Sequence, residues 1–482
     1  MLFSSPIFLF LFLPVVLWLY VVTPRPLKNI LLLLASLLFY AWGERAYVLV
    51  MLASIAWNYA FGLLVDRFHG RRAAWWVLTA SVVGNLALLV AMKYANFIVD
   101  NLNPLLTRGG WSSIELSPVH LPIGISFFTF QALSYVVDVY RRDAKAQKNP
   151  AGVALYVALF PQLIAGPIVR YRDVASELVR RRMRLKDFSE GVVRFSIGLG
   201  KKVLIANTLA APADQIFAIP ASELPTAVAW LGILCYSFQI YFDFSGYSDM
   251  AIGLGRMFGF HFARNFNYPY ISRSVTEFWR RWHISLSTWF RDYVYIPLGG
   301  NRCAAWKVYR NLLIVFLLCG LWHGAAWQFL AWGALHGCFL VVERLGFSRL
   351  LAYLPRFVGH AYLLLAVAVG WVFFRAADLG QAVDFLSSMT GFATGDAVVH
   401  SVARYLANDV STALIAATIG SLPILPRALL ACRRLERKWR PVAIPLQLAR
   451  YTGRLAAVAS ILVASAVQLA AGTYNPFIYF QF

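Results

Sequence analysis

Three histidines are the side chains in this sequence best placed for acid–base chemistry. Eight histidines are present, and five of them fall in loops, in polar turns or at the ends of apolar runs: His69, His120, His261, His360 and His400. The other three are His283, His323 and His336. An ionisable side chain within an apolar segment is a functional hypothesis by default, because holding it there as a charge costs at least ~2.5 kcal/mol.

His323 has the strongest claim to catalysis. It lies close to two glycines, Gly320 and Gly324, which let backbone or a substrate approach. Neutral imidazole is tolerated at low dielectric and can take a proton from a hydroxyl, so His323 is a candidate general base. A structural histidine hydrogen-bonded between helices is the competing interpretation, because buried polar side chains also join helices in membranes.

His283 lies in a segment rich in arginine and tryptophan. Arg280 and Arg281 precede it, and Arg291 follows. Guanidinium groups bind phosphate oxygens in pairs, so these arginines predict a cradle for a phosphate-bearing donor. Anchoring to lipid headgroups explains the same pattern. His336 lies on the next apolar run and is interpreted as a packing residue.

Two carboxylates, Asp243 and Asp249, interrupt an aromatic apolar run. They can carry protons or form ion pairs, and ion pairing is the expected role for at least one of them. The five cysteines are scattered without the spacing of a metal site, so we expect no metal and no tightly bound cofactor. No nucleotide-binding or nucleophile-elbow motif stands in a convincing context. Local chemistry alone therefore leaves an enzyme and a non-catalytic protein both open.

The elements that must position these residues are membrane helices. Of 482 residues, 60% are hydrophobic and 14% are charged, whereas soluble domains average about 45–50% apolar and about 25% charged residues. The apolar residues form runs near the ~20 residues that a helix needs to cross a bilayer. The sequence predicts an all-α polytopic membrane protein, with one domain over residues 1–482 and about eleven or twelve transmembrane helices plus re-entrant and interfacial helices.

The formal net charge of +22 comes largely from short loops between these runs. This distribution follows the positive-inside rule and makes nucleic-acid binding a poor interpretation. By this rule, the loops that contain Arg25, Arg67 and Arg141 are cytoplasmic, and segments 43–45 and 96–120 are external. Both chain termini are then predicted to be periplasmic.

The apolar run 153–168 breaks this alternation, because basic residues flank it on both sides. It contains Pro161 and Pro167, and we predict a re-entrant segment. Irregular backbone at membrane depth needs hydrogen bonds from protein or a wet cavity, so a site is expected nearby. A proline-kinked spanning helix is the alternative. The stretch 264–310 reads as interfacial helices, and the His323 turn is expected within the membrane or toward its outer side.

Four ordered motifs closely resemble the membrane-bound O-acyltransferase family: YFDFSGYSDMA at 241–251, FWRRWHISLS at 278–287, RDY through PLGGN at 291–301, and LWHG at 321–324. The opening FSSP at 3–6 and the closing PFIYF at 476–480 fit the bacterial branch, which includes the membrane subunit of alginate O-acetylation. The resemblance covers nearly the whole chain.

The resemblance implies an enzyme that takes an acyl group from a cytoplasmic thioester, acetyl-CoA in the acetylating members, and passes it through the membrane to an outer acceptor. The family's essential histidine falls on His323, and a second polar position on His283. We assign substrate binding to the following residues: Trp322, Asp243, Asp249, Arg280, Arg281 and Arg291. The implied partners are acetyl-CoA, a periplasmic SGNH-hydrolase-like acetyltransferase, a polysaccharide met through that partner, and the lipid of a bacterial inner membrane.

Other activities stay open at this stage. The same fold can serve D-alanyl transfer to teichoic acid from a carrier protein, or acylation of peptidoglycan. A transporter would carry inverted repeats, which this sequence lacks, and a scaffold for polysaccharide export would tolerate loss of His323. The polymer, whether alginate, cellulose or another glycan, is not defined by the residues. His323 is expected to act as general base, with a transient acyl-histidine as the variant.

Overall fold

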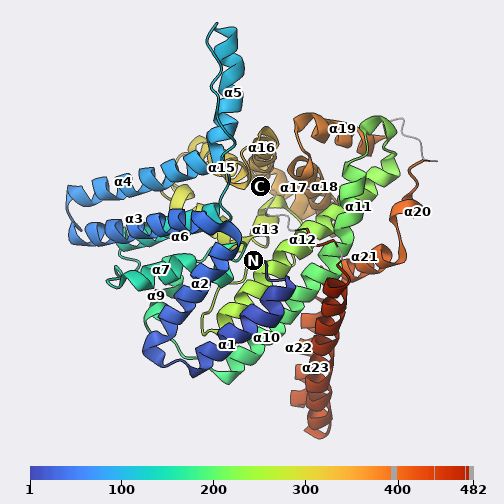
Figure 1. The fold of residues 1–482 in the computed structure, drawn as a ribbon. Coiled ribbons are helices and arrows are strands. Elements are labelled where there is room, and N and C mark those ends of the chain that lie inside the picture. The colour runs from blue at the N-terminus through green and yellow to red at the C-terminus, as the bar shows by residue number, and fades with distance from the viewer. Residues whose placement is uncertain (392–398, 439, 473, 477–482) are drawn as a thin grey trace.

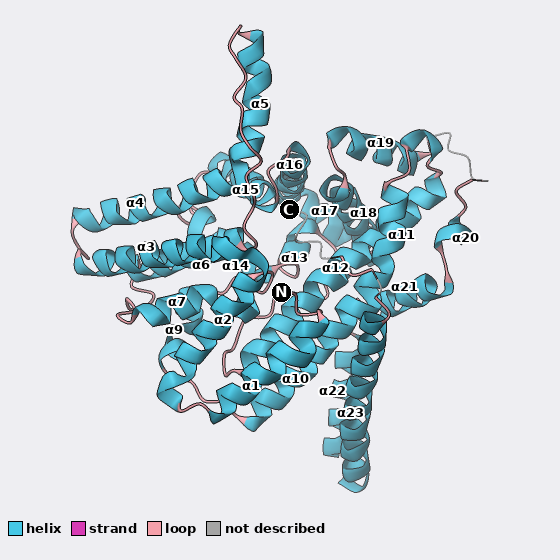
Figure 2. Cartoon of the chain, in the orientation of Figure 1, coloured by secondary structure: helices cyan, strands magenta, loops and turns pink. Residues whose placement is uncertain are grey.

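A computed structural model describes residues 1–391, 399–438, 440–472 and 474–476 of the chain (Figure 1). All regular structure in these residues is helical (Figure 2), which confirms the predicted all-α membrane fold. Most of the closing PFIYF motif, from residue 477 onward, and the C-terminal residue lie outside the described residues.

The α-helices are, in chain order, α1 (Leu13–Val22), α2 (Lys28–Glu44), α3 (Val48–Arg67), α4 (Arg72–Leu89), α5 (Ala95–Arg108), α6 (Ile125–Tyr140), α7 (Pro150–Ala158), α8 (Phe160–Leu163), α9 (Tyr171–Val179), α10 (Leu185–Gly200), α11 (Asn207–Phe217), α12 (Thr226–Met257), α13 (Val275–Trp279), α14 (Ile284–Phe290), α15 (Ala305–His323), α16 (Trp327–Val342), α17 (Ser348–Tyr353), α18 (Arg356–Arg375), α19 (Leu379–Thr390), α20 (Val402–Tyr405), α21 (Asn408–Gly420), α22 (Ile424–Lys438) and α23 (Arg440–Ala470). Four π-helical turns matter below: η4 (Val90–Tyr94), η5 (Lys201–Ala206), η8 (Arg291–Tyr295) and η9 (Glu343–Phe347).

Several helices meet the length and apolarity that a membrane crossing requires. Seven such helices occur in the described residues, or eight if the bent pair α21 and α22 forms one span. Two shorter apolar helices, Phe8–Val22 and Ile125–Tyr140, add to the bundle. The count of about eleven or twelve transmembrane helices stays a prediction.

The long helix α12 runs through the centre of the molecule beside α10 (Figure 1). Glycines allow this close approach: a Cβ at Gly198 would lie 2.5 Å from the carbonyl oxygen of Gly246, and one at Gly253 would lie 2.7 Å from that of Gly191. Helices in membranes associate through such small residues, because lipid gives no hydrophobic drive for association. The pair α10 and α12 therefore forms a rigid base for the rest of the bundle.

The predicted re-entrant segment has the geometry of a chain that enters the bundle and returns to the same end. Helix α7 breaks at Leu159, the short α8 follows, and the chain then runs back to Tyr171 at the start of α9. The Tyr171 hydroxyl donates to the carbonyl oxygen of Lys145, at 3.2 Å, in the loop before α7. The entry and exit of the segment thus lie together, which favours the re-entrant interpretation over a kinked spanning helix.

Two contacts join segments that the sequence analysis predicts to lie on the same side of a membrane. Arg142 forms an ion pair with Asp66 at 2.7 Å, which joins two loops predicted to be cytoplasmic. His120 and Glu44 lie 3.1 Å apart and join two segments predicted to be external. These two contacts agree with the predicted grouping, and the sidedness of the loops stays a prediction.

One carboxylate joins the re-entrant segment to the basic segment around η8. Asp292 accepts hydrogen bonds from Arg170 at 2.6 Å, Arg172 at 2.7 Å and Arg291 at 2.7 Å. Burial alone would raise the pKa of Asp292, but the three guanidinium groups outweigh it and hold the pKa below its usual range. Asp292 is therefore the counter-ion for three arginines contributed by two separate parts of the chain.

Replacing Asp292 with asparagine should lower thermal stability in detergent, because breaking a buried ion pair by removing one charge costs about 3–5 kcal/mol. The matched change Asp66→Asn removes an exposed pair, whose loss costs about 1 kcal/mol or less. The lowered pKa also means that this stabilisation is present above pH ~4 and is lost as the pH falls through the folded-state pKa. Equal melting temperatures for the two variants would contradict the assignment.

Candidate active site

His323 is the last residue of α15 and lies in an aromatic box. Its ring centroid is 4.9 Å from that of Trp322, 5.1 Å from that of Trp332 and 5.0 Å from that of Phe374. The residue is 6% exposed, and its Nδ1 has no hydrogen-bond partner among the described residues. The structure therefore leaves one ring nitrogen of this buried imidazole without a hydrogen-bond partner.

The turn that carries His323 is fixed by close packing of two helices. A Cβ at Gly320 would lie 2.2 Å from the carbonyl oxygen of Phe329, and one at Gly333 would lie 2.3 Å from that of Phe316. Only glycine at these two positions lets α15 and α16 cross at this distance. Gly320, one of the two glycines noted in the sequence, thus allows close approach of backbone rather than of substrate.

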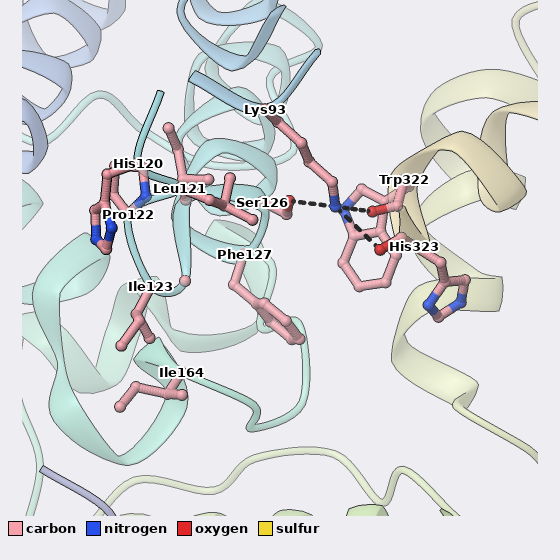
Figure 3. Close-up of a pocket in the computed structure, with 12 residues that line it drawn as sticks. Lys93, His120, Leu121, Pro122, Ile123, Ser126, Phe127, Ile164, Trp322 and His323 are labelled. Atoms are coloured by element: carbon pink, nitrogen blue, oxygen red, sulfur yellow. Dashed lines mark hydrogen bonds between the residues drawn. The ribbon is translucent and has the colours of Figure 1, made fainter. Parts of the chain in front are cut away.

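Two side chains from η4 cap the end of α15. The Lys93 ammonium donates to the carbonyl oxygens of Trp322 at 2.6 Å and His323 at 3.1 Å (Figure 3). The neighbouring Tyr94 hydroxyl donates to the carbonyl oxygen of Leu321 at 2.6 Å. The sequence analysis missed Lys93, although a lysine within the long apolar stretch that follows Trp75 is itself a signal of function.

One cavity, of about 250 Å³, reaches the His323 turn from the end of the bundle where His120 lies (Figure 3). We call it the His323 cavity. Lys93, Ser126 and Trp322 also line it, and the remaining lining residues are mostly aliphatic residues of segment 121–125. Its volume is just below the usual ~300–1,000 Å³ of ligand pockets, so it suits a small group better than a polymer chain.

A second and larger cavity, of about 710 Å³, opens among the basic residues and is called here the arginine cavity. Arg280, Arg291 and Arg344 line it, and Cys319 lines its boundary with α15. Arg291 neighbours Asp292, which binds the arginines of the re-entrant segment. The arginine cavity therefore belongs to the end of the bundle that carries the loops predicted to be cytoplasmic.

One turn of α15 contributes a lining residue to each cavity. Cys319 and His323 are four residues apart on α15, and residues at this spacing are neighbours on a helix surface. Cys319 lines the arginine cavity, and His323 lines the other. The turn of α15 from Cys319 to His323 thus borders both cavities.

His283 lies near Trp322, as His323 does. Its ring centroid is 6.1 Å from that of Trp322, and the residue is fully buried with a left-handed φ of 42°. Asn265 explains its protonation state: Oδ1 of Asn265 accepts from the Ser285 amide at 3.1 Å and lies 3.2 Å from Nδ1 of His283. Nδ1 then carries the proton, and Nε2 has a lone pair with no partner among the described residues. Burial lowers the pKa of His283 to about 3, so the imidazole is neutral.

The three arginines predicted to bind phosphate separate in the structure. Arg280 and Arg291 line the arginine cavity, but Arg281 is absent from its lining. Arg281 forms an ion pair with Glu277 at 2.9 Å and donates to the carbonyl oxygen of Asn267 at 3.1 Å. Its predicted role in donor binding stays a prediction, and the geometry favours the other two. Arg344, which the sequence analysis did not name, joins them.

The two carboxylates of the aromatic motif form ion pairs away from both cavities. Asp243 pairs with the buried Lys202 at 2.5 Å, and Asp249 pairs with Lys201 at 2.7 Å and Arg194 at 2.9 Å. These pairs join α12 to η5 and α10, which is the structural alternative left open by the sequence. Substrate binding by Asp243 and Asp249 stays a prediction without support from their positions.

His336 packs among aromatic rings, as expected. The Trp279 indole donates to its Nδ1 at 3.4 Å, and its ring centroid is 5.0 Å from that of Trp332. In the described part of the chain, no group of three or more histidine, cysteine, aspartate or glutamate side chains is arranged to hold a metal ion.

Comparison with known proteins bears on what this arrangement does. The model of the membrane-bound O-acyltransferase family matches residues 125–379. A probable alginate O-acetylase of Pseudomonas putida is 46% identical over 499 residues, with all of both chains covered. A peptidoglycan O-acetyltransferase of Helicobacter pylori is 38% identical over 428 residues, which cover 81% of this chain and 80% of the relative. A teichoic acid D-alanyltransferase of Streptococcus thermophilus is 28% identical over 319 residues, covering 62% of this chain and 72% of the relative.

Gly320→Ala should lower the melting temperature in detergent, because its Cβ would meet a backbone oxygen on α16 that cannot move alone. Overpacking of this kind costs about 1–3 kcal/mol. Gly453→Ala in α23 is the matched control, because nothing lies within 4 Å of a Cβ there. A Gly320→Ala variant as stable as the control would show that α15 and α16 do not depend on this contact.

Proposed function

This chain belongs to the membrane-bound O-acyltransferase family, and we propose that it transfers an acetyl group from cytoplasmic acetyl-CoA across the inner membrane for O-acetylation of a secreted polysaccharide. It is an O-acyltransferase and a multi-pass membrane protein. The observation that carries the proposal is the shared turn of α15, with Cys319 at the arginine cavity and His323 at the opposite cavity.

The arginine cavity is the proposed donor site. Three guanidinium groups at its lining suit the phosphates of a nucleotide-containing thioester, because arginine binds phosphate oxygens in a bidentate manner. Its volume of about 710 Å³ lies within the usual range for organic ligands. A donor held there by its phosphates would direct its thioester toward Cys319 and the next turn of α15.

His323 is the proposed general base. It would take the proton from an acceptor hydroxyl as the oxygen attacks the carbonyl carbon of the thioester. The C–S bond then breaks, the acetyl group stays on the acceptor oxygen, and the imidazolium returns the proton to the departing thiolate to give free CoA. A transient acetyl-histidine is the variant of this route. The unpartnered Nδ1 of His323 supports the role.

Trp322 and His283 would support this chemistry from one side. The Trp322 ring centroid lies 4.9 Å from that of His323 and 6.1 Å from that of His283, and Trp322 lines the His323 cavity. His283, which is neutral and has a free lone pair on Nε2, is the proposed second polar residue of the site. Both roles require the substrate to come within hydrogen-bonding reach of these rings.

The acceptor is proposed to be a secreted polysaccharide of the alginate or cellulose type, reached through a periplasmic SGNH-hydrolase-like partner. The small His323 cavity supports an acceptor that inserts one side chain or one sugar rather than a polymer. Two relatives named as probable alginate O-acetylases match over the full chain, whereas the D-alanyltransferase of Streptococcus thermophilus matches over 62% of it. Acetyl transfer is therefore favoured over D-alanyl transfer. Both termini are proposed to be periplasmic.

His323→Ala should reduce the release of free CoA from acetyl-CoA by purified protein by about 10²- to 10⁴-fold, which is the usual contribution of a general base. The assay contains the periplasmic partner and glycan, so that a required acceptor is present. His69→Ala, on an exposed loop, should release CoA at the wild-type rate. Undiminished release by His323→Ala would remove the histidine from the chemistry, and a wild type active only with a carrier-protein donor would favour D-alanyl transfer.

Arg280→Ala should raise the KM for acetyl-CoA by roughly 10-fold or more, with kcat little changed, because a hydrogen bond to a charged group contributes about 1.5–3 kcal/mol. Arg281→Ala is the comparison, since its guanidinium group is bound to Glu277 outside the cavity. A larger effect of Arg281→Ala than of Arg280→Ala on the donor KM would place the phosphates elsewhere.

A further inference from the structure

The C-terminal end of α15 is unusually complete in its hydrogen bonds for a helix end inside an apolar body. The last four carbonyl groups of a helix have no partner within it. Here Gly320 accepts from the Gly324 amide at 3.2 Å, and Leu321 accepts from Tyr94 at 2.6 Å. Trp322 and His323 both accept from Lys93, so all four carbonyls are bound.

The three hydrogen bonds that the Lys93 ammonium group donates all go to uncharged oxygen atoms. Its third contact is the Ser126 hydroxyl at 3.5 Å, and no ion pair with an acidic side chain is recorded for it in the described part of the chain. A lysine at membrane depth costs about 2.5–3.5 kcal/mol on insertion scales. The helix C-terminus carries roughly −0.5 of an elementary charge and offsets part of that cost.

From these contacts we propose that Lys93 and Tyr94 are positioning residues for acyl transfer, which hold the last turn of α15 so that His323 keeps one orientation between the two cavities. The inference rests on the proposed function. Both residues lie in η4, outside the stretch 125–379 that matches the family model. The N-terminal part of the chain would therefore complete a site whose reacting residue lies in the family region.

The last turn of α15 depends on Lys93 and Tyr94 for its hydrogen bonds. Three carbonyls beside the His323 cavity would lose their partners, and water or a frayed turn would take their place. His323 would then move with its own backbone, because its carbonyl is one of the three. A displacement of about 1 Å in a reacting group can cost on the order of 10²-fold in rate.

The test uses the purified full-length protein, with kcat and the acetyl-CoA KM measured from CoA release and the melting temperature measured alongside. Lys93→Met removes the charge at similar length, Lys93→Arg keeps the charge, and Tyr94→Phe removes one hydroxyl. Tyr59→Phe is the matched control, because the Tyr59 hydroxyl also donates to one backbone carbonyl, that of Lys148 at 2.8 Å, at the opposite end of the bundle.

We expect Lys93→Met to lower kcat on the order of 10- to 100-fold with the donor KM within about twofold of wild type, because Lys93 lies outside the arginine cavity. Lys93→Arg, which keeps the charge, should retain most of the wild-type kcat. Tyr94→Phe should lower kcat by a smaller factor, and Tyr59→Phe should leave it unchanged. Wild-type kcat in Lys93→Met, or a loss shared by Tyr59→Phe, would overturn the proposal.

A second readout does not depend on turnover. Modification of His323 by diethyl pyrocarbonate, followed by mass spectrometry, should be faster in Lys93→Met than in wild type, with the exposed His69 as the internal reference. Unchanged modification of His323 would overturn the proposal even if acetyl-CoA proved to be the wrong donor. A wild type without CoA release but with this difference in modification would instead count against the proposed function alone.

Discussion

Backbone groups freed where a helix breaks inside an apolar body must find partners within the protein, because lipid offers none. The functional part of this chain is built from three such breaks. The return of the re-entrant segment is held by Ser285, whose hydroxyl accepts from the Ile168 amide at 2.9 Å, and by Tyr156, which donates to the carbonyl oxygen of Val169 at 2.8 Å. The start of α14 is held by Asn265, and the end of α15 by Lys93 and Tyr94.

These hydrogen bonds explain why polar residues gather around one region of a chain that is otherwise so apolar. A buried polar group without a partner costs free energy, and a group that is hydrogen-bonded also fixes its neighbours. Ser285 contacts both the re-entrant segment and Asn265, and Asn265 contacts His283. The orientation of one imidazole therefore depends on the re-entrant segment, through two side chains that do no chemistry themselves.

The positively charged side chains divide into those bound within the protein and those that face a cavity. Asp292 binds three arginines at one end of the bundle, while Arg280 and Arg344 line the arginine cavity without an ion pair of their own among the described residues. The first set holds the fold together, although Arg291 in it also lines the arginine cavity, and the second is available to an anionic ligand. Near His323, Lys93 lines the cavity and is turned toward backbone carbonyls (Figure 3). Positive charge thus has a structural use in some positions and a binding use in others, although the residue type is the same.

The sequence by itself determined the membrane class and the helical fold, because composition and run length are local properties. A histidine beside two glycines is also a local feature, and it made His323 the candidate for catalysis. The sequence also indicated the re-entrant segment, since basic flanks on both sides of an apolar run are visible in one dimension. Only the tertiary structure decided which arginines face the arginine cavity, because Arg280 and Arg281 are adjacent in sequence yet Arg281 turns to Glu277. The same holds for Lys93, which lies 230 residues from His323 and meets it only after α15 has folded against η4. Pairings of this kind depend on how helices pack, and no local pattern in the chain records that.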